Sequence, residues 1–237
     1  MGLFDFLFGK TIDTDIKNHT AKIIDLINLG IDFNWEFLGD EKSGLLCGLR
    51  GNSIDNDSEY WIVLREMGRK FRFRTDNTFR SAPYSKNVST IIYEDYLRDN
   101  KLSYIFEEFN RITNGKINFQ VIDEFNPLQD ATGKENDPEF WNYSEYVKGN
   151  INYLCKYLIN GKFLEIEYCF SGVPTYHLNG DFIIRLIKAL KDIFLENDIS
   201  FVYPDMFITF FICDKQFRPN MGEYLGTYFE SLPTERK

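Results

Sequence analysis

A cysteine and a histidine are the side chains in this sequence that come closest to a nucleophile and its general base. They are Cys169 and His177, in the stretch FLEIEYCFSGVPTYHLNGD, and a thiol beside an imidazole can attack a carbonyl carbon. If residues 163–170 form a strand, Glu165 and Glu167 share the face of Cys169. Two neighbouring carboxylates disfavour the thiolate that such a nucleophile requires. We therefore expect a packed thiol here, with an enzyme site near these four residues as the less favoured alternative.

The two glutamates could also act as a pair. Along one strand face their carboxylates would lie about 7 Å apart, within reach of acid–base work or, together with His177, of a metal ion. Alternating glutamates on a strand more often form a solvated face. The only other histidine is His19, which leaves little material for metal chemistry.

A calcium-like spacing occurs once in the chain. Asp55, Asp57 and Glu59 follow the spacing of calcium-loop ligands, and Glu66 falls at the twelfth position. Tyr60 stands where such a loop needs glycine, and the following residues WIVL suggest a strand. A solvated turn is the expected structure, and we expect neither a metal nor another cofactor.

Basic and aromatic residues alternate in RKFRFR, residues 69–74. In a strand, Phe71 and Phe73 would face the core, and the basic side chains would face out, joined by Arg65 from a preceding strand. Proteins that bind single-stranded nucleic acid stack the bases on aromatic residues that share a face with the basic residues. In this stretch, strand alternation would put the aromatic and the basic side chains on opposite faces. A solvated strand face is favoured, a site for an anion or an acidic partner is second, and a nucleic-acid groove is least favoured.

The most distinctive charged segment runs from Asp123 to Glu145. It holds seven acidic residues and one basic residue, Lys134, so its net charge is -6, two thirds of the chain's net charge of -9. Aromatic anchors beside focused charge are typical of protein interfaces, and a basic protein is the partner that such charge attracts. The alternative is a solvated loop with carboxylates at a helix start and aromatic residues in the core. The candidate partner-binding residues are Asp130, Glu135, Asp137, Glu139, Trp141 and Tyr143.

Hydrophobic periodicity and turn residues predict an α+β fold with a largely antiparallel sheet and about four helices. The predicted helices are 13–29, 100–113, 137–160 and 181–196. The predicted strands are 31–38, 44–50, 60–65, 69–75, 88–94, 117–122, 163–170, 199–203 and 206–213. The last twenty residues are aromatic but without a regular pattern.

The polar segment 123–137 is the best candidate for a domain boundary. It separates an N-terminal α+β unit, residues 1–122, from a C-terminal one, residues 138–237. It could equally be a long loop inside one continuous domain.

Other features bound the class of protein. The four cysteines are far apart without a CxxC pair, which favours free, buried thiols in a reducing cytoplasm. No stretch is long and apolar enough for a membrane span.

The opening MGLFDFLFGK is expected to be a small packing helix, with a weak membrane anchor as the alternative. The acidic pI of about 4.9 argues against nucleic acid as a partner, and no oligomeric state is predicted.

Two resemblances bear on function. Residues 13–125 are expected to run helix, strands, helix, strand, and the second helix ends in FEEFNRITNGKINFQVIDE. This resembles the small α+β fold of type III secretion chaperones and their YbjN-type relatives. The resemblance implies a protein-binding module without catalytic residues.

The MGLFDFLFGK opening and the acidic, aromatic-rich, motif-poor character of the chain are similar to the immunity proteins of bacterial toxin systems. That likeness implies a cytoplasmic bacterial inhibitor that neutralises a toxin. The leading expectation is therefore a non-catalytic protein-binding protein, with a chaperone-like module as the alternative.

Overall fold

The chain forms two compact units in the computed structural model. The first contains the described residues up to Thr90 together with 200–202 and 209–230, and the second contains the described residues of 91–199, 203–208 and Ser231. The structure describes residues 14–35, 45, 49, 60–75, 78–92, 102–124, 151–171, 177–178, 180–204 and 207–231. The division expected at 123–137 lies outside these residues except for Asp123 and Glu124, and it stays a prediction.

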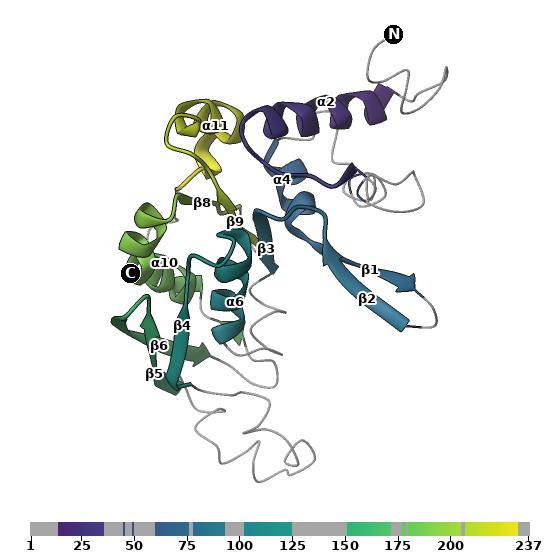
Figure 1. Cartoon of the computed structure of the whole chain (residues 1–237). Helices are drawn as coiled ribbons and strands as arrows, with labels where there is room; N and C mark the ends of the chain where they lie inside the picture. Colours follow the sequence, from purple (N-terminus) through teal and green to yellow (C-terminus); the bar gives the residue numbers. More distant parts are fainter. Residues whose placement is uncertain are drawn as a thin grey trace. The chain divides into compact units, whose positions relative to one another are not determined.

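The fold class is α+β, as expected, but the described residues contain five α-helices rather than four (Figure 1). The helices are α2 (Thr14–Asn28), α4 (Tyr60–Gly68), α6 (Ser103–Ile112), α10 (Gly180–Glu196) and α11 (Arg218–Leu225), followed by the short 3-10 helix η2 (Gly226–Tyr228). The strands are β1 (Lys70–Thr75), β2 (Thr78–Pro83), β3 (Val88–Ile92), β4 (Phe119–Asp123), β5 (Ile151–Ile159), β6 (Lys162–Ser171), β7 (His177–Leu178), β8 (Ile199–Val202) and β9 (Phe207–Ile212).

The strands form three sheets. Strands β1 and β2 make an antiparallel pair, a second sheet has the order β3-β9-β8, and a third has the order β4-β5-β6-β7. All three pairings in the four-stranded sheet are antiparallel. Its strands follow one another in the sequence, so each is joined to a neighbour in space.

Helix α4 is the largest correction in the first unit. Its first six residues, YWIVLR at 60–65, are predicted to form a strand because aromatic and β-branched residues favour strands, yet residues 60–68 are helical. Every residue from Ile62 to Gly68 is buried, so no polar stripe marked the helical period. The core around α4 includes Ile23, Leu26, Ile62, Val63, Leu64, Met67, Phe211 and Met221.

Two other predicted strands in this unit are also wrong where the structure describes them. Residues 31–34 belong to no strand, and Leu45 and Leu49 are helical. By contrast, the predicted first helix is confirmed as α2, and it ends before Gly30, whose φ of +92° suits glycine. The last twenty residues, expected to be irregular, include all of α11 and η2.

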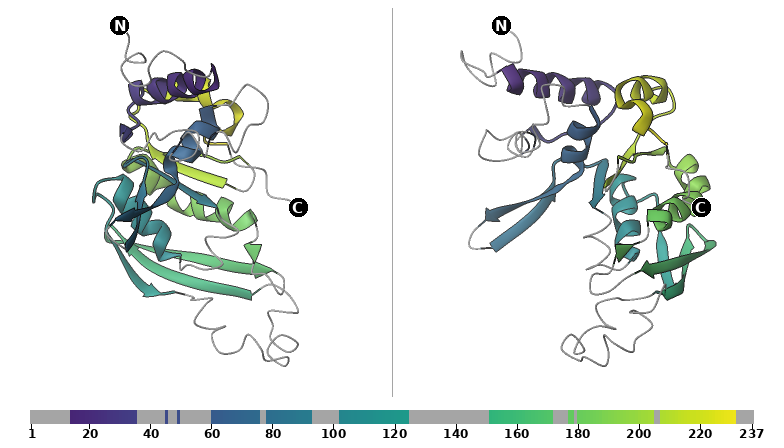
Figure 2. Two further views of the ribbon diagram at one scale, coloured as in Figure 1. Left: turned by 90° about the vertical axis from the view of Figure 1, so that its right-hand side faces the viewer. Right: turned by 180° about the vertical axis from the view of Figure 1, so that it is seen from behind.

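The second unit packs helices α6 and α10 against one side of strands β4 to β6 (Figure 2). Phe106 of α6 meets Phe119 of β4 and Tyr157 of β5 with ring centroids 5.7 and 4.8 Å apart. Phe109 meets Phe194 of α10 at 5.3 Å. The stripe predicted for the second helix, which runs from Leu102 to Ile112, is fully buried as expected.

The predicted helix 137–160 is wrong in its described part, because residues 151–159 form strand β5. Asn160 and Gly161 then make a two-residue turn into β6, with φ of +48° and +77°. Two successive positive φ angles define the type I′ hairpin turn that Asn-Gly favours. Gly161, the residue directly after the predicted helix 137–160, thus lies in a hairpin turn and not at the end of a helix.

Candidate protein-binding surface

The predicted partner-binding residues all belong to the connection between strands β4 and β5. Asp130, Glu135, Asp137, Glu139, Trp141 and Tyr143 lie outside the residues that the structure describes. What the structure does place is the two strands that the connection joins, which are antiparallel neighbours with Asp123 paired to Lys156. The connection that contains the acidic segment therefore leaves this sheet at the end of β4 and re-enters it at the start of β5.

The face of this sheet opposite α6 and α10, here called the outer face, carries both apolar and charged side chains. Cys155, Tyr157 and Ile159 are buried toward the helices, so the alternate residues of β5 lie on the outer face. Leu154 there is 43% exposed, and Phe163 of β6 is 58% exposed. Exposed large apolar side chains within one sheet face are a feature of interaction sites.

The register arranges the outer face in rows across the sheet. Leu158 of β5 lies between Gln120 of β4 and Phe163 of β6. In the next row, Lys156 lies between Asp123 and Glu165 in the same way. Cross-strand neighbours of opposite charge attract each other, so the row with the apolar side chains of Leu158 and Phe163 is followed by a charge-compensated one. Leu154, opposite Glu167, begins a further row.

Ion pairs connect β6 to helix α10. Arg185 Nη1 lies 3.2 Å from Glu167 Oε2, and Lys162 Nζ lies 2.5 Å from Glu196 Oε1. The hydrogen bond to Glu196 raises the pKa of Lys162. These pairs are exposed and therefore contribute little to stability, but they join the two ends of one stretch of β6 to the helix.

A polar cluster closes the end of β4 where the acidic connection begins. Glu124 accepts hydrogen bonds from the Ser103 amide at 2.5 Å and the Ser103 hydroxyl at 2.9 Å, and from the Tyr157 hydroxyl at 3.0 Å. Ser103 is the first residue of α6, so the carboxylate satisfies a helix-terminal amide and faces the positive end of the helix dipole. Burial, with Cys155 and Glu124 nearby, raises the pKa of Tyr157.

Sequence patterns missed this cluster and the outer face. Glu124 was counted only as one of the acidic residues, and Tyr157, Lys156 and Leu154 were assigned to a helix. The Asn160-Gly161 pair between apolar segments was the available signal, because Asn-Gly is the strongest short-range indication of a hairpin.

The four residues considered for catalysis are only partly described. Glu165 and Glu167 are exposed on the outer face, as expected for a solvated strand face. His177 pairs with Ser171 in the β6–β7 register, and Cys169 pairs with Asn152, while their side chains lie outside the described ones. An enzyme site at these residues stays a prediction.

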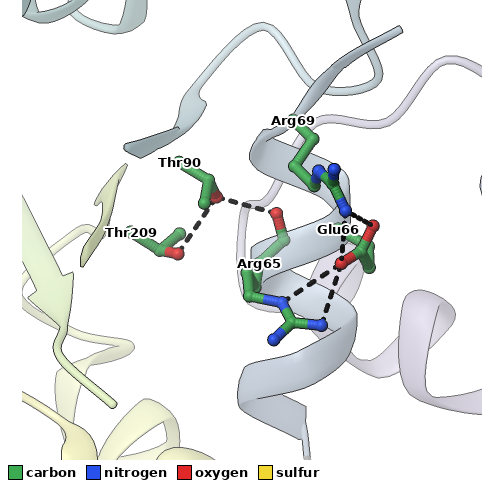
Figure 3. Close-up of polar contacts among 5 residues, drawn as sticks. All are labelled: Arg65, Glu66, Arg69, Thr90 and Thr209. Carbon is green, nitrogen blue, oxygen red and sulfur yellow. Dashed lines mark hydrogen bonds and ion pairs between the residues drawn. The ribbon is translucent and has the colours of Figure 1, made fainter. Parts of the chain in front are cut away.

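The first unit contains a buried charge cluster within the predicted basic stretch. Arg65 was expected on a strand with its side chain facing out. It lies on α4, is 7% exposed, and its Nη2 is 3.0 Å from Glu66 Oε1. Arg69 Nη1 lies 3.2 Å from Glu66 Oε2 (Figure 3). Glu66 is thus held by two guanidinium groups and buried on α4, so at this residue the expected solvated turn is wrong; Asp55, Asp57 and Glu59, the other residues of the disfavoured calcium-like spacing, lie outside the described residues.

Helix α4 is also tied to the neighbouring strands. The Thr90 hydroxyl of β3 donates to the Arg65 carbonyl at 2.7 Å and contacts the Thr209 hydroxyl of β9 at 3.0 Å. Figure 3 shows this chain of contacts beside the ion pairs. Strand β1 confirms the expected strand at 69–75, but the side chains of 71–75 are not among those described, so their predicted facing is untested.

Two of the four cysteines are among the residues whose side chains the structure describes. Cys155 and Cys213 are free and buried, as expected. Within the described residues, no group of His, Cys, Asp or Glu side chains is arranged to hold a metal ion. No helix in that part of the chain combines the length and apolar character that a membrane span needs.

Comparison with known proteins found no family profile, no curated protein and no solved structure that matches this chain.

Proposed function

We propose that this chain is a non-catalytic protein-binding protein, and that its partner docks on the outer face of the β4-β5-β6-β7 sheet and on the acidic connection between β4 and β5. The observation that carries the proposal is the exposure of Leu154 and Phe163 beside the Lys156–Glu165 pair. The connection that holds the predicted acidic and aromatic anchors starts and ends in this same sheet.

The two parts of this surface supply different contributions to binding. Exposed apolar side chains contribute affinity when a partner covers them. The net charge of -6 between Asp123 and Glu145 attracts a basic surface over a distance and accelerates its encounter. A basic protein partner therefore fits both parts. The resemblance to immunity proteins makes an inhibitor that neutralises a bacterial toxin in the cytoplasm the specific form of this proposal.

Charge reversal in the acidic connection tests the proposal. The variant Asp130→Lys, Glu135→Lys, Asp137→Lys and wild type are immobilised and exposed to lysate of the native cells at low and high salt. We expect wild type to retain a protein in stoichiometric amount at low salt and to release it at high salt, because charge screening weakens exposed ion pairs. The reversed variant should not retain it.

The matched control reverses three exposed acidic residues elsewhere, Glu107, Asp192 and Glu223, and changes the net charge equally. It should retain the partner. Equal loss in both variants would mean that total charge alone governs capture, and equal retention in both would contradict the assigned surface.

A chaperone-like module is the second candidate, favoured by the exposed apolar residues of the second unit. Besides Leu154 and Phe163, Val121 and Ile122 of β4 are 41% and 48% exposed. A chaperone-like module would bind an apolar segment with little dependence on salt. Under this alternative, Leu154→Ser with Phe163→Ser would abolish binding, and the reversal of Asp130, Glu135 and Asp137 would leave it unchanged.

A further inference from the structure

Strand β6 is paired along only one of its edges for most of its length. Its residues Lys162–Phe170 pair with β5. On the other edge, β7 pairs with Phe170 and Ser171 alone. Among the residues that the structure describes, no strand lies along the edge formed by Lys162–Cys169, here called the β6 edge.

The directions of the backbone groups follow from the neighbouring strands. Asn160 donates its amide to the Asn118 carbonyl at 2.8 Å, so even-numbered residues of β5 face β4 and odd-numbered ones face β6. A two-residue hairpin makes Ile159 and Lys162, which flank its turn, a hydrogen-bonded pair. The amides and carbonyls of Leu164 and Ile166 therefore face β5.

The intervening residues Phe163, Glu165 and Glu167 direct their amides and carbonyls to the β6 edge. Their side chains lie on the outer face, as the exposure of all three confirms. One set of residues thus offers both backbone hydrogen bonds to an added strand and the side chains that its residues would contact. This combination is what recognition by strand addition requires.

Strand β5 shows which side chains match this edge. Opposite Phe163 it places Leu158, and opposite Glu165 it places Lys156. Cross-strand neighbours of opposite charge, and apolar pairs, stabilise a sheet. An added strand meets the same three side chains from the other edge. Because Glu167 already pairs with Arg185 of α10, the added strand is best matched by a basic residue opposite Glu165 and an apolar residue opposite Phe163.

We propose that the partner contributes an extended segment, with a basic residue opposite Glu165 and an apolar residue opposite Phe163, which adds to the sheet as a strand along the β6 edge. This rests on the proposed function, that the chain binds a protein, and it specifies how the partner is recognised. Backbone hydrogen bonds give the segment its affinity. The carboxylate of Glu165 selects its charge, whereas that of Glu167 already pairs with Arg185 of α10.

A second copy of this chain is a poorer occupant of the same edge. The most extensive two-fold antiparallel pairing of β6 with itself centres on Glu165 and places the two Glu165 carboxylates opposite each other. Like charges directly opposite are destabilising, and charged edge residues are a known means of preventing self-association. The same charges favour a basic strand.

The test uses a short capped peptide in which lysine and valine alternate along one strand face, and it compares two variants at one position. Glu165→Pro removes an amide that faces the edge and leaves the β5 ladder intact, because proline is tolerated where the N–H points away from the sheet. Glu165→Thr removes the same charge but keeps the amide. We expect Glu165→Pro to weaken peptide binding about tenfold beyond Glu165→Thr, the effect of one lost backbone hydrogen bond.

Amide hydrogen exchange on the unmutated chain supplies a readout that needs no variant to fold. The amides of Phe163, Glu165 and Glu167 should exchange rapidly in the free chain and become protected when the peptide binds. The amides of Leu164 and Ile166 should be protected in both states. A peptide with the same composition but with its alternation scrambled should protect none of the three edge amides.

Three outcomes would overturn the inference. The first is peptide binding that is equal in the Pro and Thr variants without protection of the edge amides. The second is a self-associated chain in sedimentation experiments that becomes monomeric in Glu165→Pro. The third is a captured partner that does not bind the variant with charge reversal in the acidic connection but binds Glu165→Pro as tightly as it binds wild type. That last result would leave the proposed function standing and remove only strand addition.

Discussion

The Tyr157 hydroxyl donates a 3.0 Å hydrogen bond to Glu124 Oε1, and the same carboxylate caps the first turn of α6 through Ser103. Strand β5, the end of β4 and the start of α6 thus meet at one carboxylate. The acidic connection leaves β4 directly after this point, so the cluster fixes one end of the proposed binding surface.

Replacement of Glu124 by alanine should destabilise the second unit. Glu124→Ala leaves the buried Tyr157 hydroxyl and the Ser103 amide without their acceptor, and an unsatisfied buried polar group costs about 1–3 kcal/mol. Urea denaturation measures the loss. Glu107→Ala, an exposed site on the same helix, is the control and should change the unfolding free energy by less than about 0.5 kcal/mol. Equal effects of the two substitutions would contradict the capping role.

Alkaline pH should destabilise the protein through two tyrosines. Burial raises the pKa of Tyr157, and burial together with the hydrogen bond to Asp25 raises that of Tyr60. The unfolded chain then loses these protons near the ordinary value of 10.0, while the folded chain retains them. Their contribution to stability is therefore complete below that pH and is lost as the pH rises above it.

The measurement is the urea midpoint at neutral pH and at a pH above 10. Tyr60→Phe and Tyr157→Phe should each show a smaller fall between the two conditions than wild type. Tyr104→Phe, a change at a more exposed tyrosine, is the control and should leave the fall unchanged. A fall that is the same in all four proteins would show that these hydroxyls do not carry the dependence.

Removal of the buried carboxylate in the first unit should cost more than removal of its exposed partner. Glu66→Ala removes the carboxylate that lies 3.0 Å from Nη2 of the buried Arg65, and breaking a buried pair in this way costs about 3–5 kcal/mol. Arg69, whose side chain is 45% exposed, should cost less than about 1 kcal/mol when replaced by alanine. Denaturation of both variants tests the ranking, and a reversed order would contradict the assignment of Arg65 as the buried partner.

Two glycines should respond oppositely to alanine. A Cβ atom on Gly68 would lie 2.4 Å from Thr90 Oγ1 and 2.8 Å from the Thr90 backbone nitrogen, so Gly68→Ala forces α4 away from β3. A Cβ atom on Gly222 would lie no closer than 3.5 Å to any neighbour, and its helix α11 gains up to about 1 kcal/mol from alanine. Thermal unfolding should therefore show a lower Tm for Gly68→Ala and an equal or higher Tm for Gly222→Ala.

Where one face of a helix or strand is buried and the other is solvated, the sequence was sufficient to predict the element and its buried face. The stripe of α6 and most of that of α10 could be assigned because their apolar residues recur at the helical period. The exposed glutamates of β6 followed from the alternation of a strand in the same way. Local turn residues also identified the ends of α2 and α6.

Where the hydrophobic period was ambiguous or absent, only tertiary contacts decided whether a segment forms a helix or a strand. Leu154 and Leu158 of β5 fit a helical stripe, but the strand buries Tyr157 and its alternate neighbours, so the predicted core leucines lie on the outer face. Pairing with β6 through the Asn160–Gly161 turn selects the strand, and pairing of this kind is not encoded in the period of either segment. In α4, burial on every side erased the period altogether. The acidic connection could be proposed from the sequence, but the outer face escaped sequence analysis, because it exists only once the strands have paired.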